Sequence, residues 1–477
     1  MLRVRAIVVA GVLLAALPVK ADHEQLSTTD PALGEELLRQ RLQSEYLLLE
    51  RARLTPFGPA AGTEGRLFTL RLALLDVQLQ QPVTSAAPRL QVTWGGVERQ
   101  PAHLPPFRLA WGQEQSVLHS QVGAIDVTLG QGALMRHYTN NPRAGLDVGL
   151  MGVVLGVNLS GVGGTVMTGN LLEPGRLVGA HVHVRPLMLL GGNVGNTLPD
   201  AWRLLDLGTV LLSSVSLGVT GVLDSELPGT FFRGLRGPTE WRLPARVPGT
   251  AGGLSGEADV GITYGPLDFR VFGNASMLGR SFQTEAAQAA SHLWGAGASA
   301  GVRTSISAPF LRVGGAAQYD LSGPDYLPAY FDRHHEEHRL AMDNGAPKIT
   351  LRNPASHGYR LELGAQLFDA LGAFWEWVDS FALDGSLDGH RTEMRLGTVL
   401  HVLGVLDLMG AYVNRGFHDY RDAFVPDVTS LWLAEARLQV LAFSLVARGW
   451  RGYHAQIERG PTPISGSSVL AEIRLRL

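Results

Sequence analysis

The chain has 477 residues, of which 58 are Gly and 17% are charged, and its formal net charge at pH 7 is −3. This near-neutral charge gives no reason to expect a nucleic-acid partner. The sequence contains 0 Cys, which excludes disulfide bonds, thiolate metal ligands and a lipid-anchored cysteine.

Residues 1–21 are predicted to be a secretory signal peptide. Arg3 and Arg5 give a positive start, residues 6–17 give a short apolar run, and residues 19–21 give a small-residue cleavage site. The apolar run is too short to cross a bilayer as a helix, and no later stretch reaches the ~20 apolar residues that such a helix needs. The sequence therefore predicts an exported protein without helical membrane spans.

Residues 22–56 are predicted to form a separate segment around one amphipathic helix. Asp30 suits the N-cap and Pro31 the first helical position, and apolar residues then recur at helical spacing. A helix over residues 30–53 is favoured to lie in the periplasm, packed on itself or on the mouth of the barrel that the rest of the chain predicts. Two alternatives stay open: a plug in the lumen of that barrel, or a docking site for a periplasmic partner.

From residue 57 to residue 477 the pattern is that of amphipathic strands. Tyr359, Leu361 and Leu363 alternate with Arg360 and Glu362, and side chains in a strand alternate between its two faces. Similar alternation recurs at residues 125–138, 260–271, 294–304, 311–320, 373–377, 394–412 and 432–450. The prediction is an all-β fold, a transmembrane antiparallel β-barrel of about 16–18 strands.

The apolar faces of these strands are predicted to contact lipid, with aromatic residues gathered near the two membrane interfaces. The aromatic residues expected on this face are Tyr264, Phe269, Trp375, Trp377, Tyr412, Trp432 and Phe443.

Three long connections are expected to be extracellular loops or lumen constrictions: residues 186–206, 228–252 and 322–356. Loops as long as the last are usually functional or disordered. If this loop folds inward, Tyr326, Tyr330 and Phe331 are its predicted constriction residues.

The carboxyl-terminal strand, residues 467–477, supports a closed barrel. Val469, Ala471 and Ile473 alternate with Glu472 and Arg474, and a closing strand removes the exposed sheet edge. This ending and the repeated alternation resemble Gram-negative outer-membrane β-barrel proteins. Those proteins usually end in Phe or Trp, and Leu477 departs from that pattern.

Residues 125–132, which end in Gly-Gln-Gly, resemble strands of the alginate-export and capsule-attachment type of barrel. This resemblance implies a polysaccharide passage or a surface-glycan site lined by Arg and carboxylate side chains.

Charged residues on the polar faces are predicted to line the lumen. Their signs are nearly balanced, so mutual neutralisation across strands is favoured over a strongly selective anion pore. The predicted lumen-lining residues are Arg270, Arg303, Arg312, Arg360, Glu362, Glu376, Glu393, Arg395, Glu435, Arg437, Arg448, Glu472 and Arg474.

His334, Glu337 and His338 match an inverted zinc-protease motif, and they are the weak metal-ligand candidates. The motif falls in a presumed surface loop without an identifiable third ligand, so a solvated loop is the favoured interpretation. We expect neither an enzyme nor a cofactor.

Two functions remain open, both in the cell outer membrane. The favoured one is a passage, either porin-like or for polysaccharide export. The alternative is a non-conducting barrel in a trans-envelope secretion, adhesion or motility machine. The expected partners are outer-membrane lipid and lipopolysaccharide, the barrel assembly machinery, and a periplasmic protein that binds residues 30–53.

Overall fold

The computed structural model describes twenty-one separate stretches of the chain, and the predicted signal peptide (1–21) and amphipathic helix (22–56) lie outside them. The described residues are 68–80, 89–94, 107–111, 117–123, 125–140, 151–159, 161–171, 177–186, 214–227, 249–264, 266–283, 290–332, 335, 348–368, 370–385, 391–402, 404–417, 420–427, 430–441, 443–456 and 460–476.

Nearly all of the described structure belongs to one antiparallel sheet of 19 strands. Its strands are β1 (Phe68–Gln80), β2 (Arg89–Trp94), β3 (Phe107–Trp111), β4 (Leu118–Gly123), β8 (Gly152–Asn158), β9 (Val162–Thr168), β10 (Leu177–Val184), β11 (Ser216–Leu227), β12 (Gly249–Tyr264), β13 (Leu267–Phe282), β14 (Ser291–Ser307), β15 (Leu311–Ser322), β17 (Ser356–Leu367), β18 (Leu371–Ala382), β19 (Arg391–Val402), β20 (Leu406–Arg415), β21 (Leu431–Val440), β22 (Phe443–Gln456) and β23 (Gly460–Arg476).

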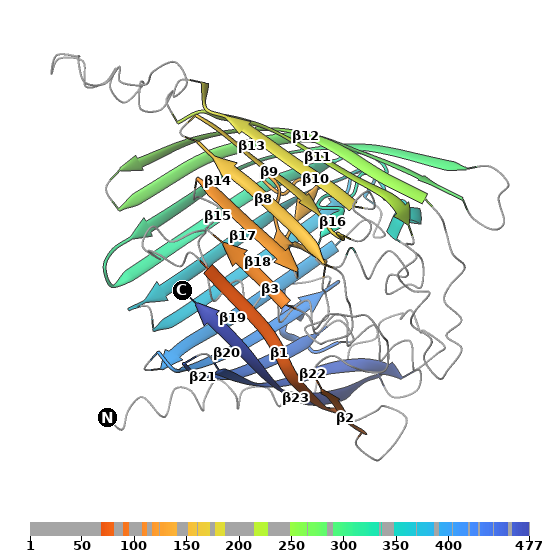
Figure 1. Cartoon of the computed structure of the whole chain (residues 1–477). Coiled ribbons are helices and arrows are strands. Elements are labelled where there is room, and N and C mark those ends of the chain that lie inside the picture. The colour runs from red at the N-terminus through yellow and green to blue at the C-terminus, as the bar shows by residue number, and fades with distance from the viewer. Residues whose placement is uncertain are drawn as a thin grey trace, which may run out of the picture.

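The sheet closes on itself, because its first strand pairs with its last (Figure 1). The register runs from Thr69 opposite Arg476 to Gln80 opposite Gly466. β2 and β3 lie along the same edge of β1, so the 19 strands make a ring of 18 positions among the described residues. The predicted all-β, antiparallel architecture and the predicted pairing of the last strand with the first are therefore confirmed.

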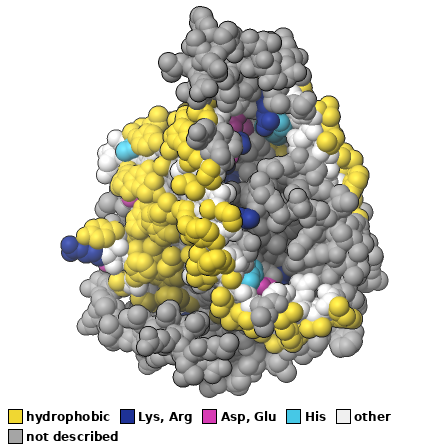
Figure 2. All heavy atoms as spheres, turned by 90° about the vertical axis from the view of Figure 1, so that its left-hand side faces the viewer, with side chains coloured by type: hydrophobic (Ala, Val, Ile, Leu, Met, Phe, Trp, Pro, Cys, Tyr) yellow, Lys and Arg dark blue, Asp and Glu magenta, His cyan; other side chains and the backbone are white. Residues whose placement is uncertain are grey.

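The two faces of each strand differ as the alternation predicts. On β17, Leu363 points outward with 57% of its surface exposed, whereas Glu362 points inward and contacts Arg136. In the space-filling view, hydrophobic side chains form broad patches on the flanks, and several charged and His side chains lie between these patches (Figure 2). Among the residues that the structure describes, no helix is long and apolar enough to cross a membrane.

The two ends of the barrel differ in the length of their connections. At the turn end, where β23 finishes, the hairpins β12–β13, β14–β15, β17–β18, β19–β20 and β21–β22 are joined by two or three residues. The opposite, loop end holds the connections 228–248, 323–355 and 416–430.

The direction of the strands corrects the predicted location of one of the three long loops. β10 is antiparallel to both β9 and β11, so it finishes beside the β8–β9 hairpin, at the turn end. The connection that contains residues 186–206 therefore leaves from the turn end, opposite the other two long connections. Residues 186–206 have a composition similar to that of the other two connections. Only the number of strands that precede them shows at which end of the barrel they begin.

Residues 125–140 correct a second prediction, because they enter the barrel instead of forming its wall. They include the short strands β5 (Asp126–Val127), β6 (Met135–Arg136) and β7 (Tyr138–Thr139), which lie outside the main sheet. Their apolar residues alternate as in a barrel strand, but this face packs on a core inside the ring, not on lipid.

Part of the connection 323–355 enters the same space. Its strand β16 (Phe331–Asp332) pairs in parallel with β6, and its 3-10 turn η4 (Lys348–Thr350) lies beside β13. Together the two inserted segments and the inner faces of β8–β14 form an apolar core. Its buried members are Ile125, Val127, Leu129, Leu134, Met135, Tyr138, Val154, Met167, Leu177, Val222, Ala251, Leu278, Phe282, Leu293, Tyr326, Leu327, Tyr330, Phe331 and Ile349.

Candidate functional site in the barrel lumen

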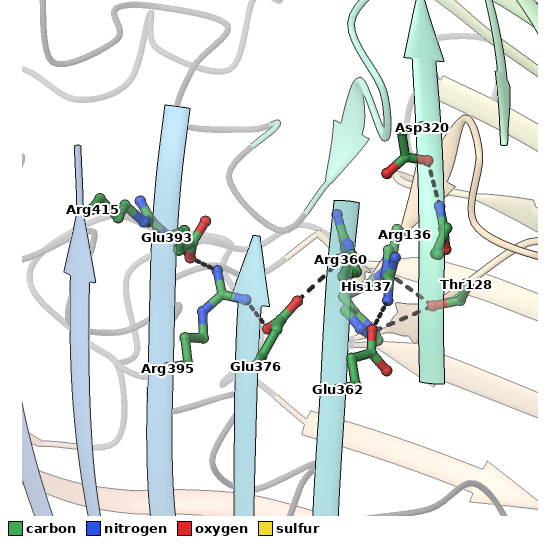
Figure 3. A network of polar contacts seen from close by, with 11 residues as sticks. Thr128, Arg136, His137, Asp320, Arg360, Glu362, Glu376, Glu393, Arg395 and Arg415 are labelled. Carbon is green, nitrogen blue, oxygen red and sulfur yellow. Dashed lines mark hydrogen bonds and ion pairs between the residues drawn. The ribbon is translucent and has the colours of Figure 1, made fainter. Parts of the chain in front are cut away.

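Five charged side chains of alternating sign cross the inner face of β17–β20; we call them the charge ladder. They are Arg360, Glu376, Arg395, Glu393 and Arg415 (Figure 3). Arg360 Nη1 lies 3.4 Å from Glu376 Oε1, and Arg415 Nε lies 3.1 Å from Glu393 Oε1. Arg395 contacts both carboxylates, so each acid stands between two guanidinium groups.

The side chains of the charge ladder are partly exposed inside the ring. Its side chains keep between 12% and 25% of their surface exposed. The apolar core on the other side of the lumen is far less exposed, with residues such as Leu129 and Leu134 at 0%. The wall of β17–β20 therefore combines charge with partial exposure, whereas the apolar core does not.

The inserted segment 125–140 reaches the wall next to the charge ladder. Arg136 of β6 forms an ion pair with Glu362 of β17, directly across from Glu376 in the strand register. The next residue, His137, has a left-handed backbone (φ 53°) and donates its N–H to Thr128 Oγ1 at 3.0 Å. This turn presents Arg136 to the wall.

The far side of the insert is fixed by a buried acid. Glu257 of β12 accepts hydrogen bonds from the backbone N–H of Gln131 and from the hydroxyl of Thr220, both at 2.7 Å. The Thr220 hydroxyl also lies 2.9 Å from Nδ1 of His181. This network ties the insert to β10, β11 and β12.

Tyr326 fixes the second inserted segment. Its hydroxyl contacts Ser276 of β13 and donates to the carbonyl of Ala133, 3.2 Å away. A Cβ on Gly297 would lie 2.3 Å from the Tyr326 ring, so glycine is required at that wall position. Burial raises the pKa of the Tyr326 phenol to about 12, so it remains a neutral hydrogen-bond donor near pH 7.

Arg280 of β13 is an anchor that the sequence analysis missed. Its guanidinium is buried and donates to the carbonyls of Leu351 at 2.6 Å and Asp325 at 2.7 Å. It also lies 5.9 Å from the Tyr330 ring centre. The sequence predicted a strand that ended at residue 271, whereas β13 continues to Phe282. Arg280 is ten residues after Arg270, so the same alternation places both side chains on the inward face.

A second charged group lies nearer the turn end, on β21 and β22. Glu435 contacts Arg437 at 3.0 Å and Arg448 at 2.8 Å, and all three side chains are buried. An apolar cluster separates this group from the charge ladder, with Val399, Met409, Ala411, Val413, Leu431 and Leu433 buried and Phe374 and Trp450 packed against them.

The remaining predicted lumen residues lie apart from the charge ladder. Arg270 is 3.6 Å from Asp259 and 3.4 Å from Asp268, and it stands opposite Arg303 in the register near the turn end. Arg312 is also near that end, opposite Ser307. The side chains of Glu472 and Arg474 lie outside the described residues.

Tyr326, Tyr330 and Phe331, the predicted constriction residues, are buried within the apolar core. Tyr330 meets Phe331 edge to face at 5.0 Å and lies 5.3 Å from the Lys348 ammonium.

The weak metal candidates His334, Glu337 and His338 lie outside the described residues. Their neighbour His335 is buried, with Nε2 2.8 Å from a carboxylate oxygen of Asp224. Within the described part of the chain, no group of three or more His, Asp or Glu residues is arranged to hold a metal ion.

Neither a protein-family model nor a curated protein matches the sequence. Among solved structures, the chain is similar to CdiB from Acinetobacter baumannii, with a TM-score of 0.34 and 8% identity over 86% of this chain, and it spans only 60% of CdiB. It is also similar to the outer-membrane-expressed OmpT of Vibrio cholerae, with a TM-score of 0.31 and 10% identity over 86% of this chain and 97% of that one. A BenF-like porin from Pseudomonas fluorescens Pf-5 gives a TM-score of 0.33 and 10% identity over 87% and 99%. At such low scores, the closed barrel rests on the chain's own strand pairing.

Proposed function

We propose that the protein is an outer-membrane β-barrel that forms a narrow, water-filled passage for small polar solutes. The observation that carries this proposal is the contrast between the two faces of a closed ring: the outer face is apolar, and the inner face bears a solvent-accessible charge ladder. A closed antiparallel barrel is one of the two structures that can cross a bilayer, because all its strand backbone groups are paired.

The membrane placement is supported by the size of the exposed apolar surface. Soluble monomers rarely expose contiguous apolar patches beyond a few hundred Å². Here large apolar side chains point outward on strand after strand, among them Val182, Leu254, Met277 and Leu363. Phe310 and Phe368 add exposed aromatic rings at the turn end, their centres 6.1 Å apart. Aromatic residues at the rims of an apolar band are typical of transmembrane barrels.

The passage lies between the inserted segments and the charge ladder. The apolar core occupies the side of the lumen bounded by β8–β14, which leaves the partly exposed wall of β17–β20 to line the route. The ion pair between Arg136 and Glu362 joins the insert to this wall, and we assign the constriction of the passage to this pair. Since the ladder carries both signs, it can contact anionic and cationic groups of one solute, and we expect weak ionic selectivity.

A second candidate is a non-conducting barrel within a trans-envelope machine. The buried apolar core inside the ring favours this candidate, because such packing fills part of the lumen. For a conducting barrel, the resemblance of residues 125–132 to the alginate-export and capsule-attachment type implies an exported polysaccharide as an alternative solute.

Single-channel conductance of the purified protein in planar bilayers tests the proposal. We expect small, discrete openings from the whole chain, and a larger conductance after residues 324–354 are replaced by a short Gly-Ser linker, because the inserted segment narrows the route. As a matched control, residues 418–429 are replaced by the same linker. Within this segment, Ala423 and Phe424 pack on the outward-facing Tyr412 of β20, so its removal should leave the conductance unchanged. No openings from either the whole chain or the 324–354 deletion, with both proteins folded, would favour the non-conducting barrel.

A further inference from the structure

We infer that the outer face of the barrel, at its loop end, binds the phosphorylated headgroup of a glycolipid in the outer leaflet, and that Arg421 and Arg451 are its phosphate ligands. The inference rests on the proposed membrane placement. It adds a lipid-binding site on the outside of the barrel, separate from the passage inside it.

Arg451 is an exception on an otherwise apolar surface. Among wall strands whose side chains the structure describes, it is the only Arg or Lys at an outward position, directly opposite Trp432 in the register. Its guanidinium carbon lies 5.7 Å from the Tyr453 ring centre. A cation facing lipid tails is strongly destabilising at the bilayer midplane and much less so near an interface. This position is therefore best explained by an anionic partner at the membrane surface.

The second arginine is carried by a segment that folds back over the outer wall. The Tyr412 hydroxyl on β20 donates to the carbonyl of Ala423 at 3.0 Å, and the Phe424 ring stacks on the Tyr412 ring at 5.9 Å. The segment includes the short helical turn η6 (Asp422–Phe424), immediately before which Arg421 is exposed. These contacts also correct the prediction that Tyr412 faces lipid, because the segment covers it.

An aromatic patch joins the two arginines. The Tyr412 ring lies 4.3 Å from Trp432, and Trp432 stands opposite Arg451 on the next strand. Adjacent strands are about 4.8 Å apart, so Tyr412 on β20 and Arg451 on β22 stand about two strand spacings, roughly 10 Å, apart. Arg421 lies two residues before Ala423, whose carbonyl accepts the Tyr412 hydroxyl, so it is on the Tyr412 side of the patch.

The chemistry of this surface fits a phosphorylated glycolipid. Guanidinium groups bind phosphate through paired hydrogen bonds, and basic sites beside membrane-spanning elements recognise anionic headgroups. Exposed aromatic rings, here Tyr420 and Phe424, are typical of the membrane interface. Short hairpins are typical of the periplasmic side of a transmembrane barrel, and the two- and three-residue hairpins lie at the turn end. The loop end is therefore the extracellular side, where the outer leaflet lies. Of the nearby acids, Asp427 accepts a hydrogen bond from the Ser430 hydroxyl at 3.1 Å, and Asp422 begins η6.

The test is a titration of diphosphoryl lipid A into phosphatidylethanolamine nanodiscs that contain the whole chain, with bound lipid counted by native mass spectrometry. We expect saturable binding that weakens about fivefold for each of Arg421→Gln and Arg451→Gln. Monophosphoryl lipid A should bind more weakly, and phosphatidylglycerol should not displace lipid A. Arg303→Gln removes the same charge from the inner face and should leave binding unchanged.

Several results would overturn the inference. Equal lipid A binding by the double variant and the unchanged protein would remove the arginines from any such site. Displacement by phosphatidylglycerol at equal charge would show only general attraction of anions. If the unchanged protein were an oligomer in nanodiscs and the double variant a monomer with the same lipid A binding, the patch would be an interface between copies of the chain. Failure of the unchanged chain to insert into nanodiscs would refute the membrane placement itself, whereas normal insertion without lipid A binding refutes this site alone.

Discussion

Glu376 contacts two cations of the charge ladder, because its carboxylate lies between the guanidinium groups of Arg360 and Arg395. The sequence placed all three side chains on inward faces, since each falls on the polar side of an alternating strand. It could not give the register between strands, which decides whether Glu376 stands beside Arg395 or two residues away. The alternation therefore predicted the composition of the ladder, while the contacts depend on the fold.

The balance of charge within the ladder predicts the effect of removing one acid. Glu376→Gln leaves Arg360 and Arg395 in place with one carboxylate fewer beside them, so the passage should become selective for anions. The measurement is the reversal potential in a KCl gradient, which we expect to be near zero for the unchanged protein and displaced in the anion-selective direction for the variant. Asp427→Asn removes the same charge from the outer segment and serves as the control. An equal displacement in both variants, or none in Glu376→Gln, would show that ions do not pass along the ladder.

At the scale of single elements, strand β17 shows why the wall was predictable and the insert was not. Its inward and outward residues alternate without interruption, and the structure preserves that alternation. Residues 125–129 alternate equally well, yet they pack inside the ring. Alternation of apolar and polar residues shows that one face of a strand is shielded from water. It does not show whether that face contacts lipid or a protein core. Contacts between distant segments, such as Phe331 opposite Met135 in the β6–β16 pair, make that choice.

The two faces of β17 should respond differently to the same substitution. Leu363→Arg places a charge in lipid, which costs roughly 2–4 kcal/mol near the midplane. Glu362→Arg puts the same group inside, where it faces water, even though it also removes the ion pair with Arg136. We expect Leu363→Arg to reduce the folded, heat-modifiable fraction on gels more than Glu362→Arg does. Equal loss from both variants would indicate that water surrounds the outer face.

At the scale of the whole molecule, ring closure depends on the last strand. β23 pairs with β22 on one side and with β1 on the other. The alternation near the carboxyl terminus predicted this strand, and the absence of another partner for its edge predicted closure. The exact ring of 18 positions could not be predicted, because the shorter wall strands carry weak patterns and residues 125–138 imitate a wall strand.

Removing residues 473–477 should therefore prevent assembly. The deletion removes the pairs from Thr69–Arg476 to Leu72–Ile473 and reopens a sheet edge at the seam. We expect protease-sensitive, uninserted chain in membrane fractionation, whereas Ser465→Thr with Ser467→Thr changes two exposed side chains, preserves the pairing and should leave insertion unchanged. Full insertion of the truncated chain would mean that the ring closes without this seam.

The most direct test of a wet lumen inside an apolar wall is thiol labelling of single-Cys variants, for which the natural absence of Cys provides a clean background. Gln366→Cys and Ser305→Cys point inward; Leu363→Cys and Val302→Cys point outward on the same or neighbouring strands. In protein reconstituted into sealed bilayers, a charged, membrane-impermeant maleimide should label the two inward positions and leave the two outward positions unreacted. Labelling of the outward positions would contradict the membrane placement, and unreactive inward positions in the folded barrel would contradict the passage.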